Sequence, residues 1–173
     1  GENSLDATTS TVRASAFGYD ALTDMVAGGY DNSAFGYRAG ANITTGDYNT
    51  GIGYESLFTQ TTGSGNTGLG YKSLYSNSSG DNNTGIGNRA GYYLTGSGNT
   101  VIGHYALYDS NITGSYNTVL GAYAGGHGGN SNVLIGYYAG WGNEDSNKLF
   151  ISSGRNYTGS SAEYGTSTTL ADY

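Results

Sequence analysis

The sequence predicts an all-β fold, a parallel β-solenoid of about eight coils with 15–18 residues each. Three observations predict it. An apolar residue followed by Gly recurs eight times at spacings of 15–18 residues. No copy carries the apolar stripe of an amphipathic helix. The 173 residues include 32 Gly and no Pro, a composition that disfavours helices and leaves every backbone N–H free to join a ladder.

Composition also excludes several classes of protein. The formal net charge of −7 argues against binding to nucleic acid, which requires clustered Lys and Arg. No apolar stretch approaches the roughly 18 residues of a membrane-spanning helix, so no membrane insertion is expected. The absence of Cys excludes disulfides, thiol nucleophiles and thiolate metal sites.

The repeats divide the chain into three regions. Residues 13–152 form the predicted solenoid domain, residues 1–12 an N-terminal cap or extension, and residues 153–173 a C-terminal cap or connecting tail. A degenerate ninth copy, Asn147–Phe150, is a further cap candidate. Each coil is long enough for two short strands and two turns, and coils that stack at about 4.8 Å place equivalent residues above one another.

An Asn stands four residues before the repeated Gly in seven of the eight copies. In a stack of coils these side chains predict a structural ladder of amides, each donating to and accepting from its neighbours. The predicted ladder consists of Asn32, Asn49, Asn66, Asn83, Asn99, Asn117 and Asn132.

Three further columns carry expectations about packing. The apolar column from Phe17 to Ile135 is expected to form the core line. A second Gly, seven residues before the repeated one, is expected in a turn with positive φ. Two residues after the repeated Gly, the first four coils alternate acid and base from Asp20 to Lys72, which favours an exposed column of paired charges.

Aromatic residues form two more columns. One residue after the repeated Gly stands Tyr in five coils, and five residues after it lies a second aromatic column. Because Tyr combines an apolar ring with a polar tip, the second column suits either a stacking ladder or a ligand-binding platform for sugars. The ladder is the preferred interpretation, and the candidate platform consists of Phe58, Tyr75, Tyr92, Tyr108 and Trp141.

The repeat also resembles a known family. The motif Asn-Thr-x-apolar-Gly-Tyr-x-Ala/Ser-Leu/Gly, as in residues 49–57 and 99–107, resembles the repeats of phage-type tail-fibre proteins. More loosely, it is similar to the heads of trimeric autotransporter adhesins. The resemblance implies a left-handed β-roll that is trimeric and lies on a fibre contacting another surface. Trimer formation would also reinforce a coil that encloses few apolar residues.

Candidate chemical sites are few. His104 occupies a column that is mostly Tyr, and His127 lies in a Gly-rich loop without nearby ligands, so no metal site is predicted. Asp47 and Asp81 are expected to cap turns rather than hold Ca²⁺. The adjacent Glu144 and Asp145 offer no cleft for polysaccharide cleavage. We therefore expect no enzyme and no cofactor.

The sequence predicts a structural and adhesive module of an extracellular fibre, such as a tail fibre, surface adhesin or secreted appendage. Its expected partners are copies of itself, as a homotrimer, and a cell-surface glycan. The alternative is the subunit of an extracellular filament whose coils stack end to end through incompletely capped termini. A polysaccharide-cleaving fibre domain is the third possibility.

Overall fold

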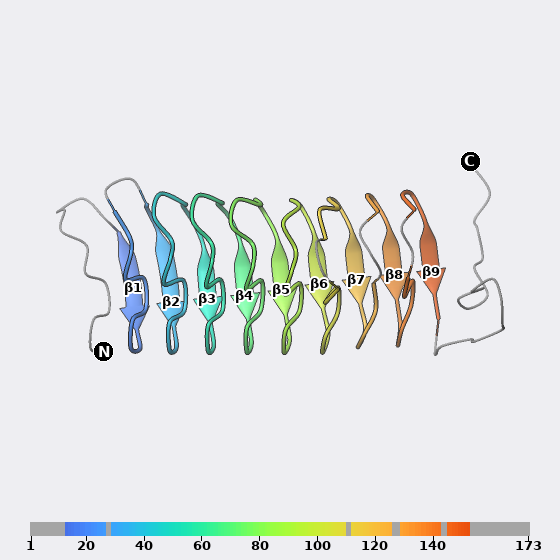
Figure 1. The fold of residues 1–173 in the computed structure, drawn as a ribbon, viewed down its shortest axis with the longest axis horizontal. Helices are drawn as coiled ribbons and strands as arrows, with labels where there is room; N and C mark the ends of the chain where they lie inside the picture. The colour runs from blue at the N-terminus through green and yellow to red at the C-terminus, as the bar shows by residue number, and fades with distance from the viewer. Residues whose placement is uncertain (1–12, 27–28, 110–111, 126–128, 143–144, 153–173) are drawn as a thin grey trace.

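The computed structural model describes residues 13–26, 29–109, 112–125, 129–142 and 145–152. These residues form one stack of about eight coils in which every coil contributes one short strand to a single sheet (Figure 1). An all-β parallel solenoid is therefore confirmed. The predicted caps at residues 1–12 and 153–173 lie outside the described residues.

The strands are three or four residues long and follow one another in sequence order. Each pairs in parallel with the next, so the sheet runs from β1 to β9 without a crossover. Eight steps of about 4.8 Å give the stack a length of about 38 Å. The strands are β1 (Ala14–Phe17), β2 (Asn32–Phe35), β3 (Thr50–Ile52), β4 (Thr67–Leu69), β5 (Thr84–Ile86), β6 (Thr100–Ile102), β7 (Thr118–Leu120), β8 (Val133–Ile135) and β9 (Leu149–Ile151).

The pairing register matches the sequence columns. Thr50 pairs with Thr67, and Ile52 pairs with Leu69. The degenerate ninth copy, considered only as a cap, forms β9 and pairs Ile135 with Ile151. Like residues therefore stack on like residues at most positions of the described sheet.

The expectation of two strands per coil is wrong. The opposite side of each coil is joined to its neighbours by backbone hydrogen bonds, such as Leu57 N–H to Ser73 O at 3.0 Å and Thr59 N–H to Tyr75 O at 3.0 Å. The backbone there is not extended, because residues two and four positions after the repeated Gly have positive φ, 49° at Glu55 and 54° at Leu57. A strand requires φ near −120°.

The expected core line is also wrong, because the apolar column faces outward. Phe17 is 71% exposed, and Leu69 is 43% exposed. Side chains alternate between the two faces of a strand. Since the Asn column is buried inside the coil, the residue two positions later also faces inward and the apolar residue three positions later must face outward.

The interior is filled mainly from two other columns. Buried Leu residues four positions after the repeated Gly pack beside small residues of the strands, Leu57 beside Gly51 and Gly68, and Leu74 beside Gly85. Toward the C-terminal end, Leu134 fills the interior from strand β8. A Cβ on Gly140 would lie 2.6 Å from the Cδ2 atom of Leu134, so Gly rather than Leu stands at this position of the column.

The second Gly column has a different cause from the one expected. Gly46, Gly63 and Gly80 do not have positive φ. A Cβ at Gly46 would lie 2.3 Å from the carbonyl oxygen of Gly63, and one at Gly80 would lie 2.4 Å from that of Gly96. Close approach of backbone to backbone, rather than turn geometry, therefore requires Gly at these positions.

We expect Gln60→Met to stabilise the protein. Gln60 is fully buried, and neither its Nε2 nor its Oε1 atom has a hydrogen-bond partner. Met has a similar shape without the unsatisfied polar atoms, so the free energy of unfolding should rise by about 1–2 kcal/mol. Thermal and denaturant unfolding measure the change.

The neighbouring amide in the same column is the matched control. Asn77 accepts a 2.8 Å hydrogen bond from Gly80 N–H, so Asn77→Leu should destabilise the protein. Unchanged or lower stability of Gln60→Met would contradict the explanation and indicate that buried water satisfies the amide.

Candidate functional site

The Asn column forms a continuous ladder inside the stack. The Oδ1 atom of each Asn accepts a hydrogen bond from the backbone N–H of the equivalent residue in the next coil, at 2.9 Å between Asn32 and Asn49. The Nδ2 atom donates to a Gly carbonyl, at 2.8 Å from Asn66 to Gly80. The same Oδ1 contact joins Asn49, Asn66, Asn83, Asn99, Asn117 and Asn132 in turn.

These amides thus bond mainly to backbone, and only some bond to each other. Asn99 Nδ2 reaches the Oδ1 atom of Asn83 at 3.0 Å. All seven side chains are buried, so every one of these hydrogen bonds replaces a lost contact with water. The column is a structural element of the solenoid interior.

A second ladder of polar side chains was not expected. Residues six positions before the repeated Gly accept hydrogen bonds from backbone N–H groups of the preceding coil, for example Asp47 Oδ1 from Tyr30 N–H at 2.7 Å. Ser64 Oγ accepts from Asp47 N–H at 3.0 Å, and Asp81 Oδ1 from Ser64 N–H at 2.8 Å. Asp47 and Asp81 bind turn backbone, in line with the capping role expected for them.

We expect Asn66→Ala to destabilise the protein by about 3 kcal/mol. The substitution leaves the N–H of Asn83 buried without a partner, at about 1–3 kcal/mol, and leaves the carbonyl of Gly80 with only the longer 3.3 Å hydrogen bond from Asn77 Nδ2. Chemical denaturation measures the loss. Asn88→Ala, which removes an exposed amide, is the control and should stay within about 0.5 kcal/mol of the parent; a similar loss in both variants would contradict the ladder's role.

The charged column pairs between Arg38, Glu55 and Lys72, as its alternation predicts, but it is not uniformly exposed. Glu55 lies between two cations, with its Oε1 atom 3.6 Å from Arg38 Nη1 and its Oε2 atom 3.2 Å from Lys72 Nζ. Glu55 is only 6% exposed. Burial acts to lower the pKa of Lys72, but hydrogen bonding to Glu55 and its charge outweigh burial and raise that pKa.

The five candidate platform residues lie beside this charged column. Phe58, Tyr75 and Tyr92 form a stack with ring centroids 5.2 and 4.8 Å apart. Tyr108 packs against Tyr92 at 5.5 Å, and Trp141 lies farther along, edge-on to Tyr138 at 5.4 Å. The structure thus joins the first four, while Trp141 belongs to a neighbouring group of rings.

Cations cover part of this aromatic column. The Cζ atom of Arg38 lies 4.4 Å from the Phe58 ring centroid, and the Nζ atom of Lys72 lies 5.0 Å from that of Tyr75. Arg89 lies among the rings of Tyr71, Tyr92, Tyr105 and Tyr108 and donates a hydrogen bond to the Tyr105 hydroxyl. Stacking and cation–π contacts occupy the ring faces that a sugar would use.

The first aromatic column stacks as well. Tyr19, Tyr37, Tyr54 and Tyr71 have neighbouring ring centroids 5.0–5.5 Å apart and nearly parallel planes. These four side chains lie in the turn after each strand and are 39–43% exposed. Two further rows run beside them, one of apolar residues and one of Ser and Thr. We define the apolar row as Phe17, Phe35, Ile52, Leu69, Ile86, Ile102, Leu120, Ile135 and Ile151.

Stability should fall at alkaline pH. Burial raises the pKa values of Tyr54 and Tyr92 above the ordinary 10.0, and that of Lys72 is raised above 10.5. A raised folded-state pKa contributes stability below the unfolded-state pKa and loses it as the pH rises through the folded value. Thermal unfolding between pH 8 and about 12 should therefore show decreasing midpoints above about pH 10.

Tyr92→Phe removes one titrating hydroxyl and keeps the ring in its stack. Its alkaline loss of stability should be smaller than that of the parent chain. An equal loss in both proteins would contradict the assignment of the effect to Tyr92.

Two aromatic side chains stand outside both stacks. Tyr48 and Tyr116 lie five positions before the repeated Gly, in the turn that precedes each strand, and are 64% and 70% exposed. Both have positive φ, 58° and 62°. The sequence alone did not point to them, because the residue type at this position differs from coil to coil. Their common position five residues before the repeated Gly is what relates the two.

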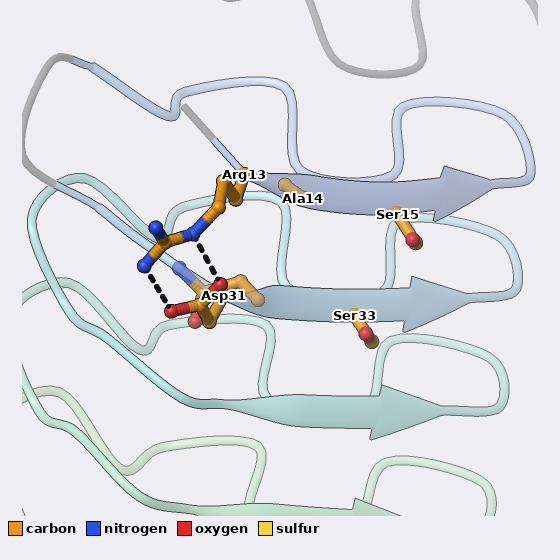
Figure 2. Close-up of a pocket in the computed structure, with 6 residues that line it drawn as sticks. Arg13, Ala14, Ser15, Asp31 and Ser33 are labelled. Atoms are coloured by element: carbon orange, nitrogen blue, oxygen red, sulfur yellow. Dashed lines mark hydrogen bonds and ion pairs between the residues drawn. The ribbon is translucent and has the colours of Figure 1, made fainter. Parts of the chain in front are cut away.

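The N-terminal end of the stack carries a shallow open hollow (Figure 2). Arg13 Nε and Nη2 each donate a 2.7 Å hydrogen bond to Asp31, which lowers the pKa of that carboxyl. Ala14 and Ser15 of β1 and Asn32 and Ser33 of β2 complete the lining. Arg13 and Asp31 thus satisfy each other's charge and hydrogen bonding at the rim of the hollow.

The remaining candidates that the structure describes do not come together in a site. His104 is exposed and packs edge-on against Tyr105 and Tyr123. His127 and Glu144 lie outside the described residues. In the described segments no three metal-ligating side chains come together, and no helix is long and apolar enough to cross a membrane.

No family model, curated protein or solved structure matches the chain. The functional interpretation therefore rests on the repeat, the geometry and the surface chemistry.

Proposed function

We propose that the chain is a structural and adhesive module of an extracellular fibre, in which three left-handed coil stacks associate through their outer faces. One observation carries the proposal. The apolar row runs unbroken along the sheet from Phe17 to Ile151, and most of its side chains are exposed in the single chain. Contiguous exposed apolar surface of this kind is typical of association sites.

The composition of the outer face supports self-association. The apolar row lies between hydroxyl side chains such as Thr67 and the edges of stacked Tyr rings, and Tyr is enriched at protein interfaces. Rotational symmetry about an axis along the stack would bring each row against its own copies. Three copies, and the left-handed coil, are the arrangement that the repeat resemblance implies.

The thin interior is a second support. The buried side chains of one coil are few and include little apolar volume; in the fourth coil they are Asn66, Ser73, Leu74 and Asn77. So small a core gains little stability from burial alone. Burial of the apolar row between copies would add apolar contact at every coil.

Attachment to another surface completes the proposed role. Turns on a rigid scaffold are where recognition usually lies, and a rod of stacked coils repeats its turns at regular intervals. A cell-surface glycan is the proposed partner, and no catalytic step is part of the proposal. The column of Phe58, Tyr75, Tyr92, Tyr108 and Trp141 remains a candidate platform for it.

The ends of the stack disfavour the filament alternative. In an end-to-end joint β9 of one copy would pair with β1 of the next. The two Asn positions at that joint hold Lys148 and Ala14 instead. An amide ladder could not continue across such a joint, whereas side-by-side association needs no change in either end.

Native mass determination tests the proposal. We expect a closed trimer for the parent chain and a shift to monomer for the double variant Ile52→Asp, Leu69→Asp, because two charges per copy would be buried without partners. Val26→Asp, at an exposed position outside the apolar row, should leave the mass unchanged.

Two outcomes would contradict the assembly. A parent chain that is monomeric at all concentrations would show that the apolar row does not mediate self-association. A mass that keeps growing with concentration would favour the filament.

A further inference from the structure

We infer that the turn edge containing Tyr48 and Tyr116 is a binding site for an extended, uncharged polysaccharide lying along the stack. This inference rests on the proposed attachment role and names its surface and ligand class. We define the turn strip as the residues five and six positions before the repeated Gly in coils three to seven. They are Asp47, Tyr48, Ser64, Gly65, Asp81, Asn82, Ser97, Gly98, Ser115 and Tyr116.

Tyr48 and Tyr116 lie in a column that is otherwise filled by short side chains. From residue 31 to residue 147 this column has positive φ, and its other members are Gly, Asn, Asp or Ser. Bulky residues with positive φ elsewhere contribute to folding, since Leu57 is buried and Tyr105 stacks on Tyr123. Tyr48 and Tyr116 are exposed and unstacked, so a role on the surface is the natural explanation.

The two rings also differ from the other tyrosines in what they contact. In the described segments, the other Tyr rings stack on another ring or lie beneath a cation, whereas Tyr48 and Tyr116 do neither. A Cβ on Gly98 would lie 2.8 and 2.9 Å from two ring atoms of Tyr116. The Tyr116 ring therefore lies against the backbone at Gly98, with most of its surface open to solvent.

The floor between the rings is low and polar. Tyr48 and Tyr116 are separated by four coil steps, about 19 Å along the stack. Gly65 and Gly98 have no side chains, and the Asn82 amide folds back so that its Oδ1 atom lies 2.5 Å from where a Gly65 Cβ would be. An extended polymer can therefore run from one ring to the other without meeting a large side chain.

Hydrogen-bonding groups line that floor. Asp47 and Asp81 each use one carboxylate oxygen to accept a backbone N–H, at 2.7 and 2.8 Å. Carboxylates have further acceptor sites, and the hydroxyls of Ser64 and Ser97 retain a donor. Apolar ring faces beside acceptors and donors match the alternating apolar and hydroxyl surfaces of a sugar ring.

Charge selects the class of sugar. Asp47 and Asp81 make the turn strip acidic, and the strip contains no Lys or Arg. Sulfated, phosphorylated or sialylated glycans would be repelled. A neutral polymer of hexose or N-acetylhexosamine units is the ligand class that fits.

Substitution by Asn separates binding from folding. Asn occupies this same column at Asn82 and Asn147, both with positive φ. Tyr48→Asn and Tyr116→Asn should therefore keep the fold and the native mass, with thermal stability unchanged or higher. Each should weaken binding about tenfold, and the double variant should weaken it about a hundredfold if the two rings act independently.

The probes are neutral linear oligosaccharides of glucose, mannose and N-acetylglucosamine in increasing length, with heparin and polysialic acid as anionic comparisons. Binding to the full chain is measured by titration calorimetry. We expect affinity for at least one neutral series to rise steeply once the oligomer can reach both rings. Tyr123→Leu, at a ring stacked between Tyr105 and Tyr138 and outside both the turn strip and the candidate platform, is the matched aromatic control and should bind as the parent does.

Four binding results would overturn the inference. These are no binding to any neutral series, preference for the anionic probes, parent-like binding by the double Asn variant, and loss of binding in Tyr123→Leu alone. A changed native mass in either Asn variant would also overturn it, because the rings would then belong to the assembly. Native mass tests the proposed assembly separately, so failure of the sugar site and failure of the trimer are distinguishable.

Discussion

The spacing of about 4.8 Å between coils is the constraint on which the rest of the structure depends. Each backbone N–H must meet an acceptor in the adjacent coil at that distance, so a residue that fits in one coil fits in all of them. Gly36, Gly53 and Gly70 illustrate the constraint, since a Cβ at any of them would lie 2.5 Å from the carbonyl oxygen of the next. Like-on-like stacking of Asn, Tyr and apolar residues follows from the same repeat distance.

Two ladders, whose hydrogen bonds run in opposite directions along the stack, hold the turn before each strand. In the Asn ladder, a backbone N–H of the later coil donates to a side chain of the earlier one, as from Asn83 to Asn66. In the ladder through Asp47, Ser64 and Asp81, the earlier coil donates to the later one. Buried polar contacts thus carry much of the cohesion that a larger apolar core supplies in other folds, which explains how a chain with 36% hydrophobic residues can be ordered.

The repeat predicted the solenoid and the parallel register, because stacking imposes similarity on each column. It did not predict that each coil has one strand rather than two, or which face each column occupies. Polar residues usually lie outside, and a strand interpreted that way places Ile52 in the core and Asn49 on the surface, the reverse of what the structure has. The prediction of positive φ at Gly46 was wrong for a related reason, because a Gly required by close backbone approach looks the same in sequence as one required by positive φ. Tyr48 and Tyr116 were missed because a column defined by backbone conformation accepts Tyr, Gly, Asn, Asp and Ser, and so shows no repeated residue type.

Aromatic rings stack in one part of this surface and expose their faces in another, and the residues at the same position in the neighbouring coils decide which. One residue after the repeated Gly, Tyr37 and Tyr54 stand in successive coils, so stacking covers their ring faces. At Tyr48 and Tyr116 the neighbouring coils have Gly, Asp or Ser at that position, so no stack forms and a ring keeps an open face. Positive φ at a bulky residue has an energetic cost, and neither burial nor stacking of these two rings offsets it. The apolar row and the turn strip lie on different parts of each coil, so the solenoid can assemble through one while it contacts a ligand through the other.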